Sequence, residues 1–278
     1  MAWNYAAVNK MVPWIYFLAV VTAELLIGSD NACAGMILYL ILLAALFIQV
    51  VRSYPSVQVN AGLNIVDESP ASRMVPNSRI RFYLALMMVP LVRIVGLPLF
   101  LADIPMTYRL VLVGLPLFTA AFIIIRFAGY RAQDIYLTFS SPILYFLTLQ
   151  LIIGVTGIPF GLIEHKLLPD TLSLLPPPFR HGEAAFILIC FSGFLEELIF
   201  RGVLLRAAGD YMGKNIGSIY ISFLFAALQI PRLLFLEVIF AFLVGLLFCR
   251  MVRRTGSIWG VSLAHGLMNI MLYLDVYF

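Results

Sequence analysis

Long apolar runs separated by short polar stretches form the main pattern of the chain. A helix that crosses the hydrocarbon core of a bilayer needs about 20 mostly apolar residues. Nine runs approach this length, at residues 12–28, 35–51, 82–101, 108–125, 142–162, 184–204, 215–230, 233–251 and 257–276. The pattern predicts an all-α, polytopic integral membrane bundle of about nine transmembrane helices.

Composition agrees with this class of protein. Hydrophobic residues make up 63% of the chain and charged residues 12%, roughly half the charged fraction of a typical soluble domain. We find no basic patch interleaved with aromatic residues, so nucleic acid is not an expected partner. The three cysteines are far apart and give no disulfide or metal-binding spacing.

The Lys and Arg residues predict an orientation in the membrane. With nine spans, twelve of the eighteen fall in segments on the side of the N-terminus, and four fall on the other side. Because cytoplasmic loops carry the excess of Lys and Arg, we expect a cytoplasmic N-terminus. The expected location is a bacterial inner membrane.

A proline-rich stretch, LPDTLSLLPPPFRHGE at 168–183, divides the chain. We predict an N-terminal part of about five helices at 1–167, and a C-terminal core of about four helices at 168–278. The five N-terminal helices are expected to pack outside this core.

Three charges interrupt the apolar run SGFLEELIFRGVLL. Glu197 and Arg201 are four residues apart and can pair on one helix face. Neighbouring helix residues point about 100° apart, so Glu196 faces elsewhere and is a candidate general base. The alternative is that all three charges reach water at the cytoplasmic end of the helix.

Two further pairs stand four residues apart on apolar helices. His265 and Asn269 share a face and could donate hydrogen bonds to a developing oxyanion, or could simply join two helices. Phe225 and Gln229 form the other pair, and Gln229 alone would suggest helix packing.

Together the three motifs resemble those of a known family. EELIFR at 196–201, FAALQ at 225–229 and HGLMN at 265–269 are similar to the ordered EExxxR, FxxxH and HxxxN motifs of the CAAX prenyl endopeptidase and bacteriocin-processing family of intramembrane glutamic proteases. The resemblance covers roughly residues 184–276.

The resemblance implies a metal-independent endopeptidase that needs no cofactor. Glu196 would activate water, His265 and Asn269 would stabilise the oxyanion, and Glu197, Arg201 and Phe225 would be structural or positioning residues. The substrate would be a membrane-associated peptide, a lipidated protein or a transmembrane protein, cut at a site that opens toward the cytoplasm.

Gln229 departs from the family pattern, which has histidine there. Glutamine cannot exchange a proton near neutral pH, but it keeps a hydrogen-bond donor and an acceptor. Two outcomes stay open. Either Glu196 is the sole base and Gln229 orients water or the oxyanion, or the site is degenerate and the protein is a membrane scaffold or chaperone.

Other functions have weaker support. A transporter with the three charges on its path would be expected to show inverted repeats, and we find none. A zinc site lacks the usual HExxH spacing. Arg93 lies inside an apolar run between two prolines, where it could mark a broken helix that lines a cavity; we expect an ion pair with Glu24 or a position at the edge of the span.

Overall fold

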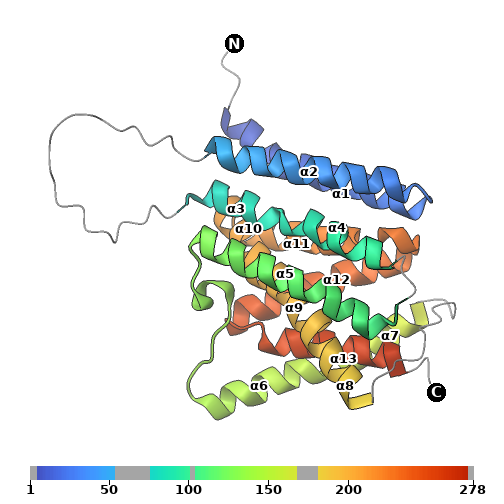
Figure 1. Ribbon diagram of the computed structural model, residues 1–278. Coiled ribbons are helices and arrows are strands. Elements are labelled where there is room, and N and C mark those ends of the chain that lie inside the picture. The colour runs from blue at the N-terminus through green and yellow to red at the C-terminus, as the bar shows by residue number, and fades with distance from the viewer. Residues whose placement is uncertain (1–4, 54–75, 101–103, 168–180, 275–278) are drawn as a thin grey trace, which may run out of the picture.

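The computed structural model describes residues 5–53, 76–100, 104–167 and 181–274, and Figure 1 shows their arrangement. Every regular element within these ranges is helical. Within the described residues, each of the nine predicted apolar runs lies mainly in helix, and the predicted all-α membrane bundle is confirmed.

Six stretches of helix within the described ranges are long and apolar enough to cross a membrane alone. They are Met11–Gly28, Ala32–Ser53, Ser78–Pro98, Tyr108–Ala128, Ile143–Leu167 and Phe235–Thr255. The other three predicted runs are shorter or carry the polar site, and they pack inside the bundle.

The described residues up to 167 form seven α-helices and one short 3-10 turn. They are α1 (Tyr5–Gly28), α2 (Ala32–Ser53), α3 (Ser78–Leu86), α4 (Met88–Phe100), α5 (Met106–Ala128), η1 (Ala132–Ile135), α6 (Ile143–Val155) and α7 (Gly157–Leu167). The pairs α3–α4 and α6–α7 each continue nearly end to end, and each pair accounts for one predicted run.

The C-terminal part begins with one long, compound helix. It comprises α8 (His181–Ile187), η2 (Leu188–Phe194), α9 (Leu195–Glu197), η3 (Leu198–Leu204) and α10 (Leu205–Met212), where η2 and η3 are π-helical. It is followed by α11 (Lys214–Ala227), the 3-10 turn η4 (Ile230–Arg232), α12 (Phe235–Thr255) and α13 (Trp259–Leu274).

Connections alternate between the two ends of the bundle. At one end, Ile258 N–H donates to the Tyr136 carbonyl at 3.1 Å, and the Arg81 guanidinium lies over the Tyr130 ring at 5.0 Å. At the other end, Gly28 of the α1–α2 turn approaches Pro231. Arg81 therefore lies at the end of the bundle that holds Tyr130, and the predicted orientation in the membrane stays a prediction.

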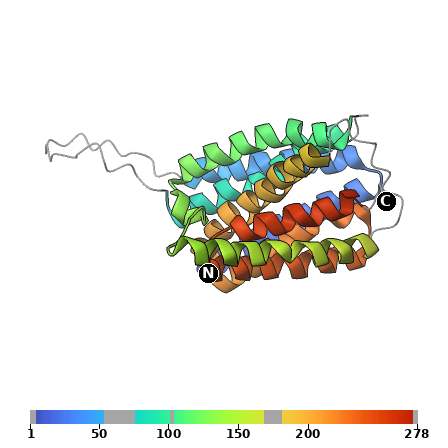
Figure 2. The same ribbon diagram turned by 90° about the horizontal axis from the view of Figure 1, so that it is seen from below.

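Helix α13 is held between two neighbours by very close backbone approaches. A Cβ atom on Gly157 of α7 would lie 2.0 Å from the Ala264 carbonyl oxygen, and one on Gly193 of η2 would lie 2.6 Å from Gly266 N. Figure 2 shows α13, in red, between the gold α8–η2 segment and the yellow-green α6 and α7. Small residues at these positions let the helix backbones touch.

A side chain from α6 fixes the start of α13. The Gln150 Oε1 atom accepts a hydrogen bond from Gly260 N–H at 2.7 Å, deep inside the bundle. The first N–H groups of a helix have no partner within the helix, so this carboxamide satisfies one of them.

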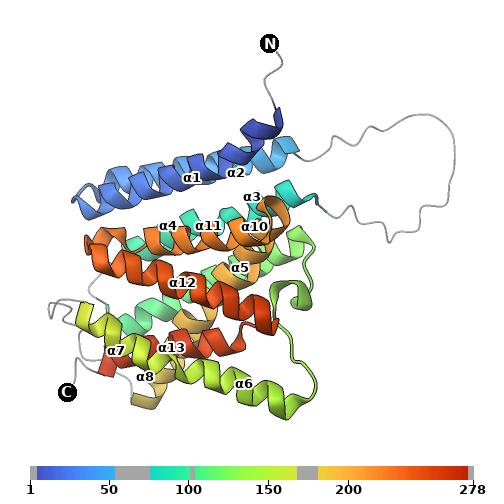
Figure 3. The same cartoon turned by 180° about the vertical axis from the view of Figure 1, so that it is seen from behind.

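The fifth N-terminal span is in direct contact with the C-terminal core, since α6 and α7 pack on α13. That the five N-terminal helices pack outside this core stays a prediction. In Figure 3, α1 and α2 lie at one edge of the bundle, and α6 and α7 lie at the opposite edge. The start of the predicted core, at 168–180, lies outside the described residues, and the division at 167/168 stays a prediction.

The close approach of Gly157 to α13 predicts that one added methyl group at this position destabilises the fold. We expect Gly157→Ala to lower the free energy of unfolding by about 1–3 kcal/mol, since α7 must move away from α13. Gly96→Ala is the control, because a Cβ atom at Gly96 meets nothing within 4 Å. Unfolding midpoints in detergent micelles measure the difference, and equal midpoints for the two variants would contradict the close packing.

Candidate active site

The two adjacent glutamates lie on one short α-helical turn between two π-helical segments. This turn is α9, with η2 before it and η3 after it. A π segment widens the helix locally and is frequent at functional sites. The two carboxylates have different surroundings: Glu197 is fully buried, whereas the Glu196 side chain is 38% exposed. Their predicted roles stay predictions.

The predicted ion pair between Glu197 and Arg201 is present. Arg201 Nη1 donates to Glu197 Oε1 at 2.7 Å, and neither side chain is exposed. The alternative that these charges reach water at the helix end is therefore wrong for this pair. Each group is the counter-ion of the other, so neither charge is buried alone.

Aromatic rings cover the rest of the Arg201 guanidinium. Its Nε and Nη2 atoms are buried without a hydrogen-bond partner, and its Cζ lies 4.3 Å from the centre of the Phe225 ring. Phe248 and Phe200 add ring faces at 5.6 and 5.9 Å. A cation over an aromatic face is attracted by the ring quadrupole, so these rings replace the missing hydrogen bonds.

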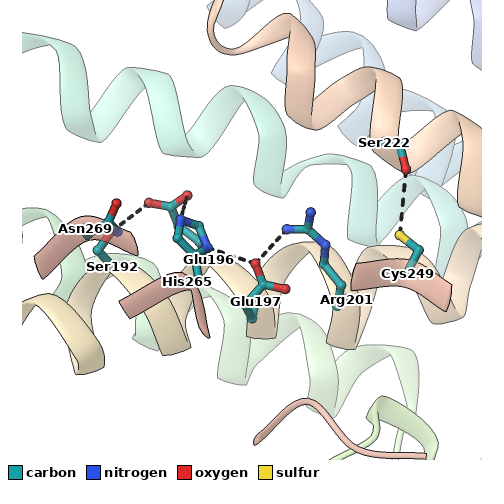
Figure 4. Close-up of polar contacts among 8 residues, drawn as sticks. All are labelled: Ser192, Glu196, Glu197, Arg201, Ser222, Cys249, His265 and Asn269. Carbon is teal, nitrogen blue, oxygen red and sulfur yellow. Dashed lines mark hydrogen bonds and ion pairs between the residues drawn. The ribbon is translucent and has the colours of Figure 1, made fainter. Parts of the chain in front are cut away.

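His265 lies between the two carboxylates (Figure 4). Its Nδ1 atom is 2.8 Å from Glu197 Oε1, and its Nε2 atom is 3.7 Å from Glu196 Oε2. Because an ionised carboxylate can only accept, Nδ1–H is the donor to Glu197. The ring therefore presents Nε2 to Glu196. Contact with Glu197 was not expected from the sequence.

Ser192 joins Asn269 to Glu196. Asn269 Nδ2 donates to Ser192 Oγ at 2.7 Å, and Ser192 Oγ donates to Glu196 Oε1 at 3.1 Å. Sequence reasoning missed Ser192, although its position four residues before Glu196 was a usable signal. Asn269, Ser192, Glu196, His265, Glu197 and Arg201 thus form one continuous polar row.

The second motif reaches the site through Phe225. The Phe225 ring meets the His265 ring edge-on at 5.9 Å, in addition to covering Arg201. Gln229 lies beyond the last residue of α11, half-buried, with its N–H bonded to the Ala226 carbonyl at 3.0 Å. No hydrogen bond links its side chain to the polar row in the described part of the chain, so its catalytic role stays a prediction.

The donor atoms around the polar row bear on metal binding. Within the described ranges, no group of three or more His, Cys, Asp or Glu side chains is arranged to hold a metal ion. The chemistry that the polar row offers is that of carboxylates, an imidazole, a carboxamide and a hydroxyl.

The fold and the site define an integral membrane protein of several spans with a polar row inside its helical bundle. Residues 183–271 match the family model described as Type II CAAX prenyl endopeptidase Rce1-like. This segment contains all three sequence motifs and the whole polar row, and the predicted family resemblance is confirmed there. The family is one of CAAX proteases that act in membranes.

The match begins after α7 and leaves the N-terminal helices outside it. No curated protein and no solved structure matches the chain.

The buried ion pair gives a testable difference in stability. We expect Arg201→Met to lower the free energy of unfolding by about 3–5 kcal/mol, because Glu197 is left buried without its counter-ion. Arg206→Met breaks the half-exposed Arg206–Asp210 pair and should cost about 1 kcal/mol or less. Thermal unfolding of both purified variants checks this, and comparable losses would contradict the special position of Arg201.

Proposed function

We propose that this protein is an intramembrane endopeptidase that hydrolyses a peptide bond in a membrane-associated peptide or protein. The carrying observation is the half-exposed Glu196 carboxylate facing His265 Nε2, while the buried Glu197–Arg201 pair holds the other side of the imidazole. One carboxylate is thus accessible for chemistry and the other is fully engaged in support.

Glu196 takes the role of general base in this proposal. It removes a proton from a water molecule, which attacks the carbonyl carbon of the scissile bond. Ser192 fixes Glu196 by donating to Oε1, and this leaves Oε2 facing the imidazole. The carboxylate then returns the proton to the leaving amine, so it acts first as base and then as acid.

His265 and Asn269 take the role of oxyanion donors. The Nδ1–H of His265 is already used by Glu197, so donation to the oxyanion requires a second proton on Nε2, and the imidazolium would then stand between two carboxylates. The Asn269 amide carries two N–H groups, and one of them is bonded to Ser192. The second is the proposed donor.

Gln229 supports a second candidate function. It replaces the histidine of the family motif and cannot exchange protons near neutral pH. In the endopeptidase it would orient the attacking water or donate to the oxyanion. If the site is instead degenerate, this protein would bind a membrane partner as a scaffold or chaperone.

The proposed setting is a bacterial inner membrane, with the N-terminus in the cytoplasm and the site opening toward that side. The orientation is supported by the sequence, in which twelve of the eighteen Lys and Arg residues fall in segments on the side of the N-terminus when nine spans are assumed. The proposed substrates are membrane-associated peptides, lipidated proteins and transmembrane proteins.

Comparison of peptide termini in the native host separates the two candidates. We expect at least one N- or C-terminus of a membrane-associated peptide or protein to disappear in Glu196→Gln, and to persist or increase in Gln229→His. Glu183→Gln is the matched control, since it removes an exposed carboxylate from the same compound helix. Quantitative mass spectrometry of membrane fractions reads the termini.

Identical termini in all four strains, with a phenotype only on deletion of the whole chain, would exclude the endopeptidase and favour the scaffold.

The glutamic mechanism also predicts that metal chelators do not change the rate of peptide cleavage. Purified protein should cut a peptide that contains the junction found in the host at the same rate with and without EDTA or 1,10-phenanthroline, because the proposed base is a carboxylate and not a metal-bound water. A loss of activity that added zinc restores would contradict metal independence.

A further inference from the structure

Gln229 lies in a turn whose backbone is not part of a regular α-helix. Helix α11 ends at Ala227, and the chain continues through Leu228, Gln229 and the short η4 turn. Leu233 closes the turn with a φ of 55°, in the left-handed region that non-glycine residues seldom adopt. A conformation of this kind persists where the surroundings hold it.

Arg93 of α4 holds the first residue of this turn. Its Nη2 atom donates to the Leu228 carbonyl oxygen, and its Nε atom donates to Glu24 Oε1 of α1 at 2.5 Å. The last carbonyls of a helix have no partner within the helix and carry partial negative charge, so a guanidinium is well matched to them. One planar side chain therefore bridges α1 and the end of α11.

Glu24 is in turn fixed from α2. Its side chain is fully buried, and it accepts a hydrogen bond from the Tyr39 hydroxyl, which is also fully buried. Buried charges within a membrane protein are costly and persist where they are paired or functional. The predicted Arg93–Glu24 ion pair is confirmed, and the extra bond to Leu228 shows that it serves more than charge balance.

Helix α1 also contacts the turn directly. A Cβ atom on Gly28 would lie 3.0 Å from Pro231 Cα and 3.1 Å from a Leu233 side-chain methyl group. The turn is thus held at Leu228 by Arg93 and at Pro231 by the end of α1.

We propose that Glu24, Tyr39 and Arg93 form an N-terminal clamp that positions Gln229 for catalysis. The clamp residues belong to α1, α2 and α4, which lie outside the matched segment 183–271. The N-terminal helices are therefore part of the proposed active site. The matched segment alone would carry Gln229 on a turn that lacks the contacts from α1, α2 and α4. This inference rests on the proposed endopeptidase function, and the clamp residues are positioning residues.

Hydrogen–deuterium exchange of the turn tests the clamp without any substrate. The Gln229 N–H donates to the Ala226 carbonyl at the end of α11, and the Arg232 and Leu233 N–H groups donate to the Gln229 and Ile230 carbonyls, so these three amides report on the turn. In Arg93→Met we expect them to exchange about tenfold faster or more, as for loss of a hydrogen bond to a charged group. Arg206→Met, which removes a remote guanidinium, should leave their exchange unchanged.

Two milder variants keep the test decisive if Arg93→Met folds poorly. Arg93→Lys retains the charge opposite Glu24, but an ammonium lacks the planar fork that reaches two acceptors at once. The clamp predicts fast exchange in this variant, whereas a purely charge-balancing role predicts wild-type exchange. Tyr39→Phe removes one hydroxyl and should speed exchange in the turn by a smaller factor.

The proposed effect of the clamp on catalysis is tested by measuring kcat and KM. The substrate is a peptide that contains the cleavage site lost in the Glu196→Gln strain. We expect Arg93→Lys to lower kcat while KM stays near the wild-type value, since Gln229 is displaced and substrate contacts elsewhere remain. Unchanged exchange in the Arg93 variants, or fast exchange with unchanged kcat, would overturn the clamp. If wild-type protein cuts nothing, the proposed function fails, and the exchange data alone decide whether the clamp holds the turn.

Discussion

The buried Glu197–Arg201 ion pair is the interaction on which the rest of the site depends. Neither side chain reaches solvent, and each is the other's counter-ion. Arg201 is also covered by the Phe225 ring of α11, and Glu197 accepts from His265 of α13. The compound helix, α11 and α13 thus all contact this one charge pair. The pair thus has a structural role, in which it connects the three sequence motifs.

Close helix packing supplies the second constraint. The side chains of His265 and Asn269 reach η2 and α9 because Gly193 lets α13 approach to contact distance. On the opposite side, Gly157 presses α7 against the same helix. Helix α13 therefore has little freedom to shift or rotate, and its two polar side chains face the carboxylates in one register. The positions of the polar side chains are therefore set by Gly193 and Gly157, which do not belong to the polar row themselves.

Much of the bundle could be predicted from apolar runs, because lipid imposes a length and a composition on each span. The Glu197–Arg201 pair followed from helical spacing in the same way. Contacts between segments distant in sequence could not be predicted. The bonds from His265 to Glu197 and from Gln150 to Gly260 depend on how α13 packs, and no local spacing encodes that packing. Ser192 was missed because a serine in an apolar helix usually bonds to its own backbone.

The two π-helical segments have a consequence for how this sequence can vary. Each π segment behaves like one extra residue inserted into an α-helix, which advances the phase of everything after it by about 100°. Deleting a single residue from η2 would turn Glu196 and Glu197 away from α13, and an apolar position would face His265 instead. Side chains along this helix could therefore be exchanged one at a time, whereas a change in its length would shift every side chain that follows. The number of residues in the compound helix thus fixes which side chains face α13.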